Sequence, residues 1–217
     1  MSYKTTDLVT CPHCGHKQRM PIWGIVNATE NKRKKHEIIN GTFFECTCKN
    51  CGETNIITYS MLYHDDVNSM MIYHVQSTLG ITDAHIAIND RRKYIKDTDD
   101  CKIRIVTSPN ELKEKIILCE NNLDDRIIEL MKALIVEELS VRKELGNIDS
   151  VLCSVRDDGN FDFDVFADET GTLTVKRSFY DYIEKKTRAL LNRQCPNPIE
   201  VNMDFALNFL SQNHFQK

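Results

Sequence analysis

The sequence lacks a long apolar run. Nowhere in its 217 residues do roughly 18 uninterrupted apolar residues offer a membrane-spanning helix. The first residues, Met1–Asp7, also lack the apolar segment of a signal peptide. We therefore expect a cytoplasmic protein without a membrane partner.

The sequence also has little net charge. Its 28 Lys and Arg residues nearly balance 32 Asp and Glu residues, which leaves a formal charge of -4. So small a net charge gives no overall electrostatic attraction to nucleic acid or to anionic membranes. Internal repeats and low-complexity tracts are absent, and the hydrophobic and charged fractions, 41% and 28%, are typical of a globular chain with a core.

Cysteine, in contrast, is abundant. The chain has nine cysteines, an odd number, and no secretion signal. Reducing compartments do not sustain disulfide frameworks, so this usage favours metal ligation and free thiols. Four of the cysteines show no metal-ligand spacing and are expected to be free thiols: Cys101, Cys119, Cys153 and Cys195.

Four other cysteines form two pairs with equal spacing, each followed by a glycine: Cys11, Cys14 and Gly15, then Cys48, Cys51 and Gly52. Two intervening residues let the chain reverse so that both sulfurs face one ion, and glycine tolerates the left-handed backbone that closes such a turn. Four thiolates complete a tetrahedron and leave no open position for a substrate. The pattern predicts a structural metal site.

Zinc suits this ligand set because it accepts thiolates and has no redox chemistry. Iron is the alternative, since a rubredoxin-like electron-transfer site uses the same ligands. Cys46 is a possible further ligand through its spacing to Cys48. The glycine-ended turn from Cys48 to Cys51 is the better ligand pair, so we interpret Cys46 as a neighbour.

The residue pattern predicts an α+β fold. In the N-terminal part we expect strands on both sides of Cys11–Cys14, a polar helical insertion over 28–39, and a hairpin with Cys48–Cys51 at its tip, followed by a strand at 69–75. This arrangement is a zinc-ribbon-like β domain over residues 1–80. Residues 81–101, which include a charged run and the acidic cluster 97–100, are expected to connect it to the rest.

Residues 102–217 are expected to form helices and a small antiparallel-sheet α+β domain. A strand at 102–107 precedes helices from Ser108 to about Leu145. In the second part of this stretch, apolar residues at helical spacings predict a core-facing amphipathic helix, and Asp125 and Glu129 occupy the other positions. Further predicted elements are a three-stranded meander (151–155, 161–165, 172–175), a helix (178–191), a strand (199–201) and a terminal helix (204–210).

The segment Cys11-Pro12-His13-Cys14 resembles the CpXC domain family, named for its Cys-Pro-any-Cys pattern. The second pair departs from this pattern, because Lys49 stands where a second proline is expected. Similarity continues in Leu62–Asp65, Met71–Tyr73 and Leu123–Met131, so that it covers roughly the first 130 residues. The resemblance implies a zinc-ribbon-like domain, and it supplies no biochemical activity.

These features favour a structural-zinc module for interaction or regulation, whose partner is another protein or a second copy of the chain. Nucleic-acid binding through the basic run Lys32–Lys35 is an alternative, although such runs are usually solvated helix faces. His64-Asp65-Asp66 superficially offers a metal-dependent enzyme site, yet local hydrogen bonding is its simpler interpretation. We therefore lean against an enzyme.

Overall fold

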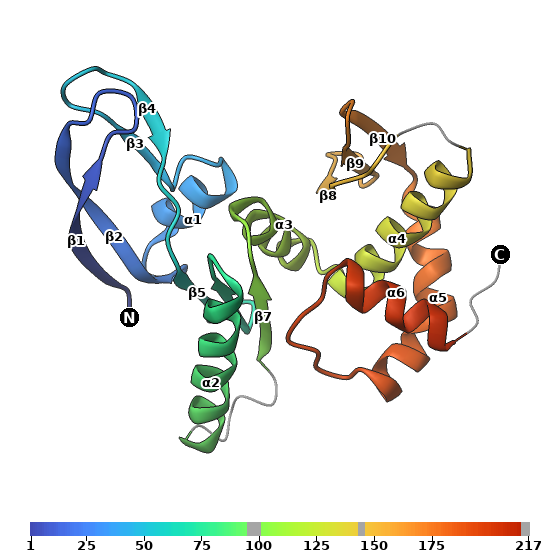
Figure 1. Ribbon diagram of the computed structural model, residues 1–217. Coiled ribbons are helices and arrows are strands. Elements are labelled where there is room, and N and C mark those ends of the chain that lie inside the picture. Colours follow the sequence, from blue (N-terminus) through green and yellow to red (C-terminus); the bar gives the residue numbers. More distant parts are fainter. Residues whose placement is uncertain (95–100, 143–145, 214–217) are drawn as a thin grey trace. The chain divides into compact units, whose positions relative to one another are not determined.

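The computed structural model describes residues 1–94, 101–142 and 146–213 (Figure 1). The chain divides into two compact units, Met1–Lys113 and Glu114–Lys217. The division falls inside one helix, and each unit is described separately below.

The first unit is built on a five-stranded mixed sheet. Its strands, in spatial order, are β1 (Tyr3–Thr10), β2 (Lys17–Asn27), β5 (Met61–Asp65), β6 (Met70–His74) and β7 (Lys102–Val106). β1 and β2 pair antiparallel, as do β5 and β6, whereas β2 with β5 and β6 with β7 pair in parallel. Strand β7, which the sequence-based division placed with the C-terminal part, thus hydrogen-bonds within this sheet.

The β1–β2 hairpin extends beyond the sheet. β2 pairs with β5 only through Ile25–Asn27, whereas it pairs with β1 along most of the length of β2. Pro21 therefore sits where β2 has no second strand neighbour among the described residues, a position that tolerates its missing N–H. The extension carries the first cysteine pair at its tip.

A separate hairpin carries the second pair. β3 (Glu45–Thr47) and β4 (Thr54–Ile56) pair antiparallel over three residues each. The β1–β2 and β3–β4 loops lie side by side in Figure 1. Two strands this short are marginal on their own, so the hairpin needs support from elsewhere in the unit.

The polar insertion forms helix α1 (Lys32–Ile39), which buries Ile38 and ends before Gly41 at φ +80°. These two hairpins and this helix agree with the sequence-based expectation. The sequence analysis missed β5 and helix α2 (Thr78–Tyr94). α2 buries Ala84 and Ile88 but exposes Leu79 and Ile86, so its apolar residues do not mark one face.

The second unit combines helices with a three-stranded sheet. Its elements are the rest of α3 (Pro109–Glu120), α4 (Asp125–Arg142), β8 (Ser150–Val155), β9 (Phe161–Phe166), β10 (Gly171–Val175), α5 (Arg177–Gln194) and α6 (Met203–Gln212). The start of α3, which belongs to the first unit, has a capping box in which Ser108 Oγ accepts from the Glu111 N–H and Glu111 Oε2 accepts from the Ser108 N–H, both at 3.2 Å.

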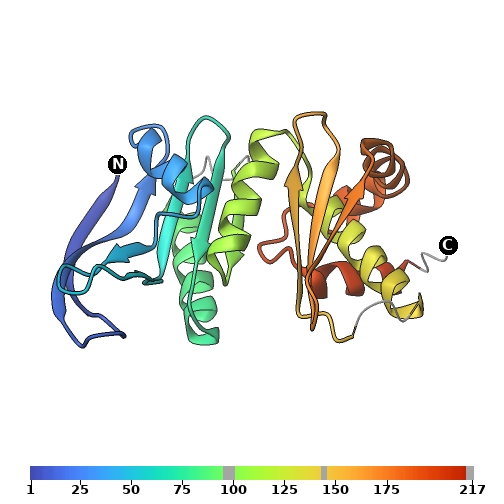
Figure 2. The ribbon, with the colours of Figure 1, turned by 90° about the horizontal axis from the view of Figure 1, so that it is seen from above.

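The predicted meander is confirmed, with strand order β10-β9-β8 (Figure 2). Phe161 and Phe163 are fully buried, whereas the alternating residues Asp162 and Asp164 are only partly buried. The core of this unit joins one face of the sheet to helical residues that include Leu130, Met131, Tyr180, Leu191 and Phe209.

Two expectations for this unit were wrong. Residues 199–201 form no strand, and the Val201 carbonyl accepts a hydrogen bond from Lys115 Nζ at 2.8 Å instead. Asp125 and Glu129 of α4 are buried rather than solvated. The acidic cluster 97–100 and residues 143–145 lie outside the described residues.

Candidate metal centre

The first cysteine turn follows directly from the end of β1. The Gly15 N–H donates to the Cys11 carbonyl and the Cys11 N–H donates to the His16 carbonyl, both at 2.9 Å. Gly15 has φ +73°, which side-chain-bearing residues rarely adopt. The glycine therefore closes the turn that directs the Cys11 and Cys14 sulfurs to one side.

The second turn repeats this geometry at the tip of the β3–β4 hairpin. The Gly52 N–H donates to the Cys48 carbonyl at 2.9 Å, and the Cys48 N–H donates to the Glu53 carbonyl at 2.8 Å. Gly52 has φ +77°. The equal spacing in the sequence thus corresponds to two equivalent backbone turns.

The two turns bring the four predicted cysteines together. The sulfurs of Cys11 and Cys51 are 3.8 Å apart, those of Cys14 and Cys48 are 3.7 Å apart, and all four lie within 4.8 Å of one another. Four sulfurs at about 2.3 Å from a central ion in a tetrahedron would be about 3.8 Å apart. The cluster therefore has dimensions that could hold one metal ion.

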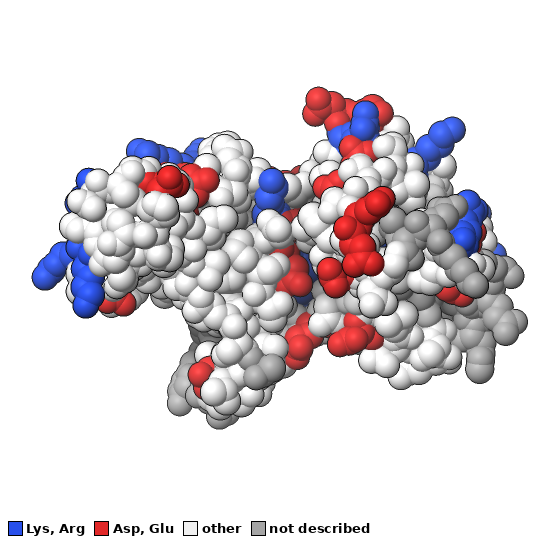
Figure 3. Space-filling model, turned by 45° about the horizontal axis from the view of Figure 1, so that its top comes forward, with Lys and Arg blue, Asp and Glu red and all other residues white. Residues whose placement is uncertain are grey.

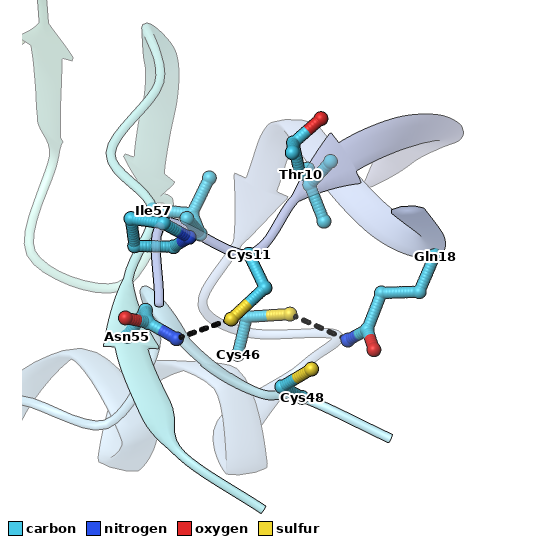
Figure 4. Close-up of a pocket in the computed structure, with 9 residues that line it drawn as sticks. Thr10, Cys11, Gln18, Cys46, Cys48, Asn55 and Ile57 are labelled. Carbon is cyan, nitrogen blue, oxygen red and sulfur yellow. Dashed lines mark hydrogen bonds between the residues drawn. The ribbon is translucent and has the colours of Figure 1, made fainter. Parts of the chain in front are cut away.

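Cys46 lies beside this cluster and is not among its four members. Its sulfur accepts a hydrogen bond of 3.1 Å from Gln18 Nε2 (Figure 4). Gln18 Nε2 also donates to the Thr47 carbonyl at 3.0 Å, and Gln18 Oε1 accepts from the Lys49 N–H at 2.8 Å. Gln18 of β2 thereby holds the strand and turn that carry the second pair.

Two amides approach the sulfurs. Asn50 Nδ2 lies 3.6 Å from Cys14 Sγ, and Asn55 Nδ2 lies 3.7 Å from Cys11 Sγ, the latter visible in Figure 4. Such donors favour thiolate over thiol. The sequence analysis did not identify Gln18, Asn50 or Asn55, since nothing in their spacing indicates contact with the cysteines.

The electrostatics of the cluster are uneven. The backbone N–H of His16 and the amide of Asn50 lower the pKa of Cys14 to about 6. The backbone N–H of Glu53 acts to lower the pKa of Cys51, but burial and the three neighbouring thiols outweigh it and raise that pKa to about 12. A cation among the sulfurs would favour all four thiolates at once.

Space beside the cluster is small. A crevice of about 10 Å³ is lined by Cys11, Cys46 and Cys48, with Gln18 and Asn55 at its sides (Figure 4). This volume is about the minimum for one water molecule. The crevice has no room for an organic substrate.

The His64-Asp65-Asp66 segment organises the β5–β6 turn. Asp65 accepts hydrogen bonds from Tyr63, Lys35 and Asn68, and His64 Nε2 lies 3.0 Å from Asp66 Oδ1. Burial acts to raise the pKa of Asp65, but the bonds from Asn68 and Lys35 outweigh it and lower that pKa. Within the described ranges, the cysteine cluster is the one group of potential ligands close enough to hold an ion.

The basic run on α1 is largely paired within its own unit. Arg33 and Lys34 both form ion pairs with Glu37, and Lys35 Nζ lies 3.0 Å from Asp65 Oδ2. In the view of Figure 3, basic side chains form separate groups rather than one continuous face. This arrangement matches the solvated helix face that such a run usually forms.

All nine cysteines are free of disulfide bonds, and Cys153 is buried in the second unit. None of the helices in the described part of the chain is long and apolar enough to cross a membrane.

Comparison with known proteins places the chain in a family. No curated protein and no solved structure matches it. A family model described as CpXC protein matches residues 9–132, more than half of the 217 residues, and the match includes both cysteine pairs. Together with the cysteine cluster, this match agrees with the resemblance seen in the sequence: the chain belongs to the CpXC family.

Proposed function

We propose that Cys11, Cys14, Cys48 and Cys51 bind one Zn²⁺ ion with a structural role. The observation that carries this proposal is the spacing of 3.7 and 3.8 Å between sulfurs from two separate turns. Zinc accepts four thiolates in a tetrahedron of this size.

The ion would join the β1–β2 hairpin to the β3–β4 hairpin. The β3–β4 hairpin has strands of only three residues, and Gln18 supplies its side-chain hydrogen bonds to β2. Structural zinc contributes about 10 to 16 kcal/mol in small peptides near neutral pH. Zinc binding would therefore decide whether this end of the first unit folds.

A structural role agrees with the surroundings of the sulfurs. Four protein ligands complete the coordination shell, and the adjacent crevice of about 10 Å³ admits no organic substrate. A catalytic metal instead keeps one position open for water or substrate. These features favour structure over catalysis at this centre.

Elemental analysis of untagged, freshly purified protein tests the proposal, with an absorption spectrum of the same sample. We expect about one zinc per chain, as one tetrahedral site requires, and no visible absorption. Iron with visible colour would replace zinc by a rubredoxin-like centre. Folded protein without metal would overturn the proposal.

We further propose that the chain acts as an interaction module whose partner is a second copy of itself. Strand β1 has one strand neighbour, β2, among the described residues, and so presents a free edge. Tyr3 and Leu8 on this strand are 57% and 58% exposed. An edge strand with exposed apolar side chains supports pairing with another strand.

The molar mass in solution, measured by light scattering as concentration rises, tests this second proposal. We expect a dimer that Leu8→Glu disrupts. Val67→Glu is the matched control because Val67 is also exposed, at 77%, but lies in the β5–β6 turn. A constant monomer mass would exclude the second copy and direct the search to a different protein.

A further inference from the structure

Five charged side chains are buried together in the second unit. Each is at most 4% exposed, and we call them the buried charge cluster: Glu114, Lys115, Asp125, Glu129 and Lys132. Charged residues are seldom fully buried, because an ion removed from water must be compensated by partners. The cluster therefore needs an explanation beyond helix packing.

The cluster forms a chain of alternating charges between α3 and α4. Lys132 Nζ lies 2.7 Å from Glu114 Oε2 and 3.1 Å from Glu129 Oε1. Lys115 Nζ lies 3.0 Å from the same Glu129 oxygen and 3.3 Å from Asp125 Oδ2. Burial acts to lower the pKa of Lys132, but Glu114 and Glu129 outweigh it and raise that pKa, so the ammonium stays charged.

Glu114 also contacts the main chain of the sheet. Its Oε1 accepts a hydrogen bond of 2.5 Å from the Cys153 N–H. β8 is an end strand in the order β10-β9-β8, so among the described residues only one of its two edges pairs with another strand. A carboxylate in α3 thus satisfies a buried group at the free edge of the sheet.

Lys115 contacts the main chain of the segment 196–202. Its Nζ donates to the Val201 carbonyl at 2.8 Å, and Val201 is only 3% exposed. The sequence predicted a strand at 199–201, within this segment. The ammonium takes the place of the donor that a neighbouring strand would supply.

We propose that the buried charge cluster is a main-chain docking site, at which α3 and α4 hold the edge of β8 and the segment 196–202. Apolar side chains could pack two helices, but they could not satisfy Cys153 N–H and Val201 C=O. All five charged residues lie within the family match at 9–132, whereas the two docked positions lie beyond it. Contacts to main-chain atoms do not depend on the side chains at those positions.

Hydrogen exchange on the full chain tests this proposal. Lys115→Met keeps the length of the side chain and removes its donor. We expect amides of the segment 196–202 to exchange about tenfold faster or more, relative to those of the core strand β9, as loss of one hydrogen bond to a charged group implies. Equal acceleration in β9 and in 196–202 would overturn the proposal.

Glu114 offers a second, finer comparison. Glu114→Gln keeps an oxygen for the Cys153 N–H, whereas Glu114→Ala removes it, so only Ala should selectively speed exchange at Cys153. Glu138→Gln, which alters the exposed pair with Arg142 on α4, is the matched control and should leave both segments unchanged. If Gln and Ala at position 114 speed amide exchange at Cys153 equally, the Glu114 carboxylate serves only to pair α3 with α4 and does not hold the Cys153 N–H. The proposal then fails.

Discussion

Gln18 Oε1 accepts a hydrogen bond of 2.8 Å from the backbone N–H of Lys49, inside the second cysteine turn. The same side chain donates to Cys46 and to the Thr47 carbonyl. One buried amide on β2 therefore connects the first hairpin to the second without using the sulfurs of the four clustered cysteines. This connection positions one pair of sulfurs relative to the other.

Gln18→Ala should destabilise the first unit by about 1 to 3 kcal/mol, because it leaves the Lys49 N–H and the Thr47 carbonyl without this partner. The metal should also be lost faster to a chelator, since the second turn is held less firmly. Denaturant unfolding and the rate of metal release measure the two effects. Arg19→Ala, at the exposed neighbouring position, should change neither, and equal effects in both variants would contradict the role of Gln18.

Cys51→Ser should lower the metal content and unfold the end of the first unit, because it removes one of four clustered sulfurs. Cys11→Ser should do the same. Metal analysis of the purified variants, with circular dichroism, provides the measurement. A full equivalent of metal in either variant would refute the ligand assignment.

Cys46→Ser is the matched control for these variants. Its sulfur lies outside the cluster and accepts from Gln18, an acceptor role that a serine hydroxyl can keep. We expect unchanged metal content and at most a small loss of stability. Loss of the metal would make Cys46 a ligand.

The cysteine cluster could be anticipated because its determinants are local. Two intervening residues and a glycine at positive φ define each turn, and the two turns differ little. The supporting residues could not be anticipated, because Gln18 and Asn55 reach sulfurs across separate hairpins. Their roles depend on tertiary proximity, which no short spacing encodes.

The same distinction explains the fold. The meander was predicted because Phe161 and Phe163 alternate with Asp162 and Asp164 at the period of a strand, and these aspartates are partly exposed in the structure. The burial of Glu129 was not, because its charge suggests a solvated position and its partner Lys115 lies on another helix. The segment ending at Val201 resembles a strand in sequence. Lys115, rather than a neighbouring strand, donates the hydrogen bond to the Val201 carbonyl.

Removing the metal with a chelator should loosen the first unit selectively. We expect faster amide exchange in β3, β4 and the two cysteine turns, because short strands alone are marginal. The core around Phe161 and Phe163 in the second unit contains none of the four clustered cysteines and should stay protected. Unchanged exchange around the cysteines after complete metal removal would show that the hairpins do not depend on the ion.

His74 should make the first unit sensitive to mild acid. Its side chain is buried, and burial lowers its pKa below the ordinary 6.5 although Nδ1 contacts the Tyr59 carbonyl at 2.9 Å. Below pH 6.5 the unfolded chain therefore binds a proton at His74 more readily than the folded chain does. The contribution of His74 to the free energy of unfolding is fully present above pH 6.5 and declines as the pH falls toward the lowered pKa. His74→Gln should flatten this part of the unfolding profile, whereas His36→Gln, which removes an exposed imidazole on α1, should not. Acid release of the metal affects both variants, so the difference between them isolates His74. An NMR titration that places the His74 pKa at or above 6.5 would contradict the argument.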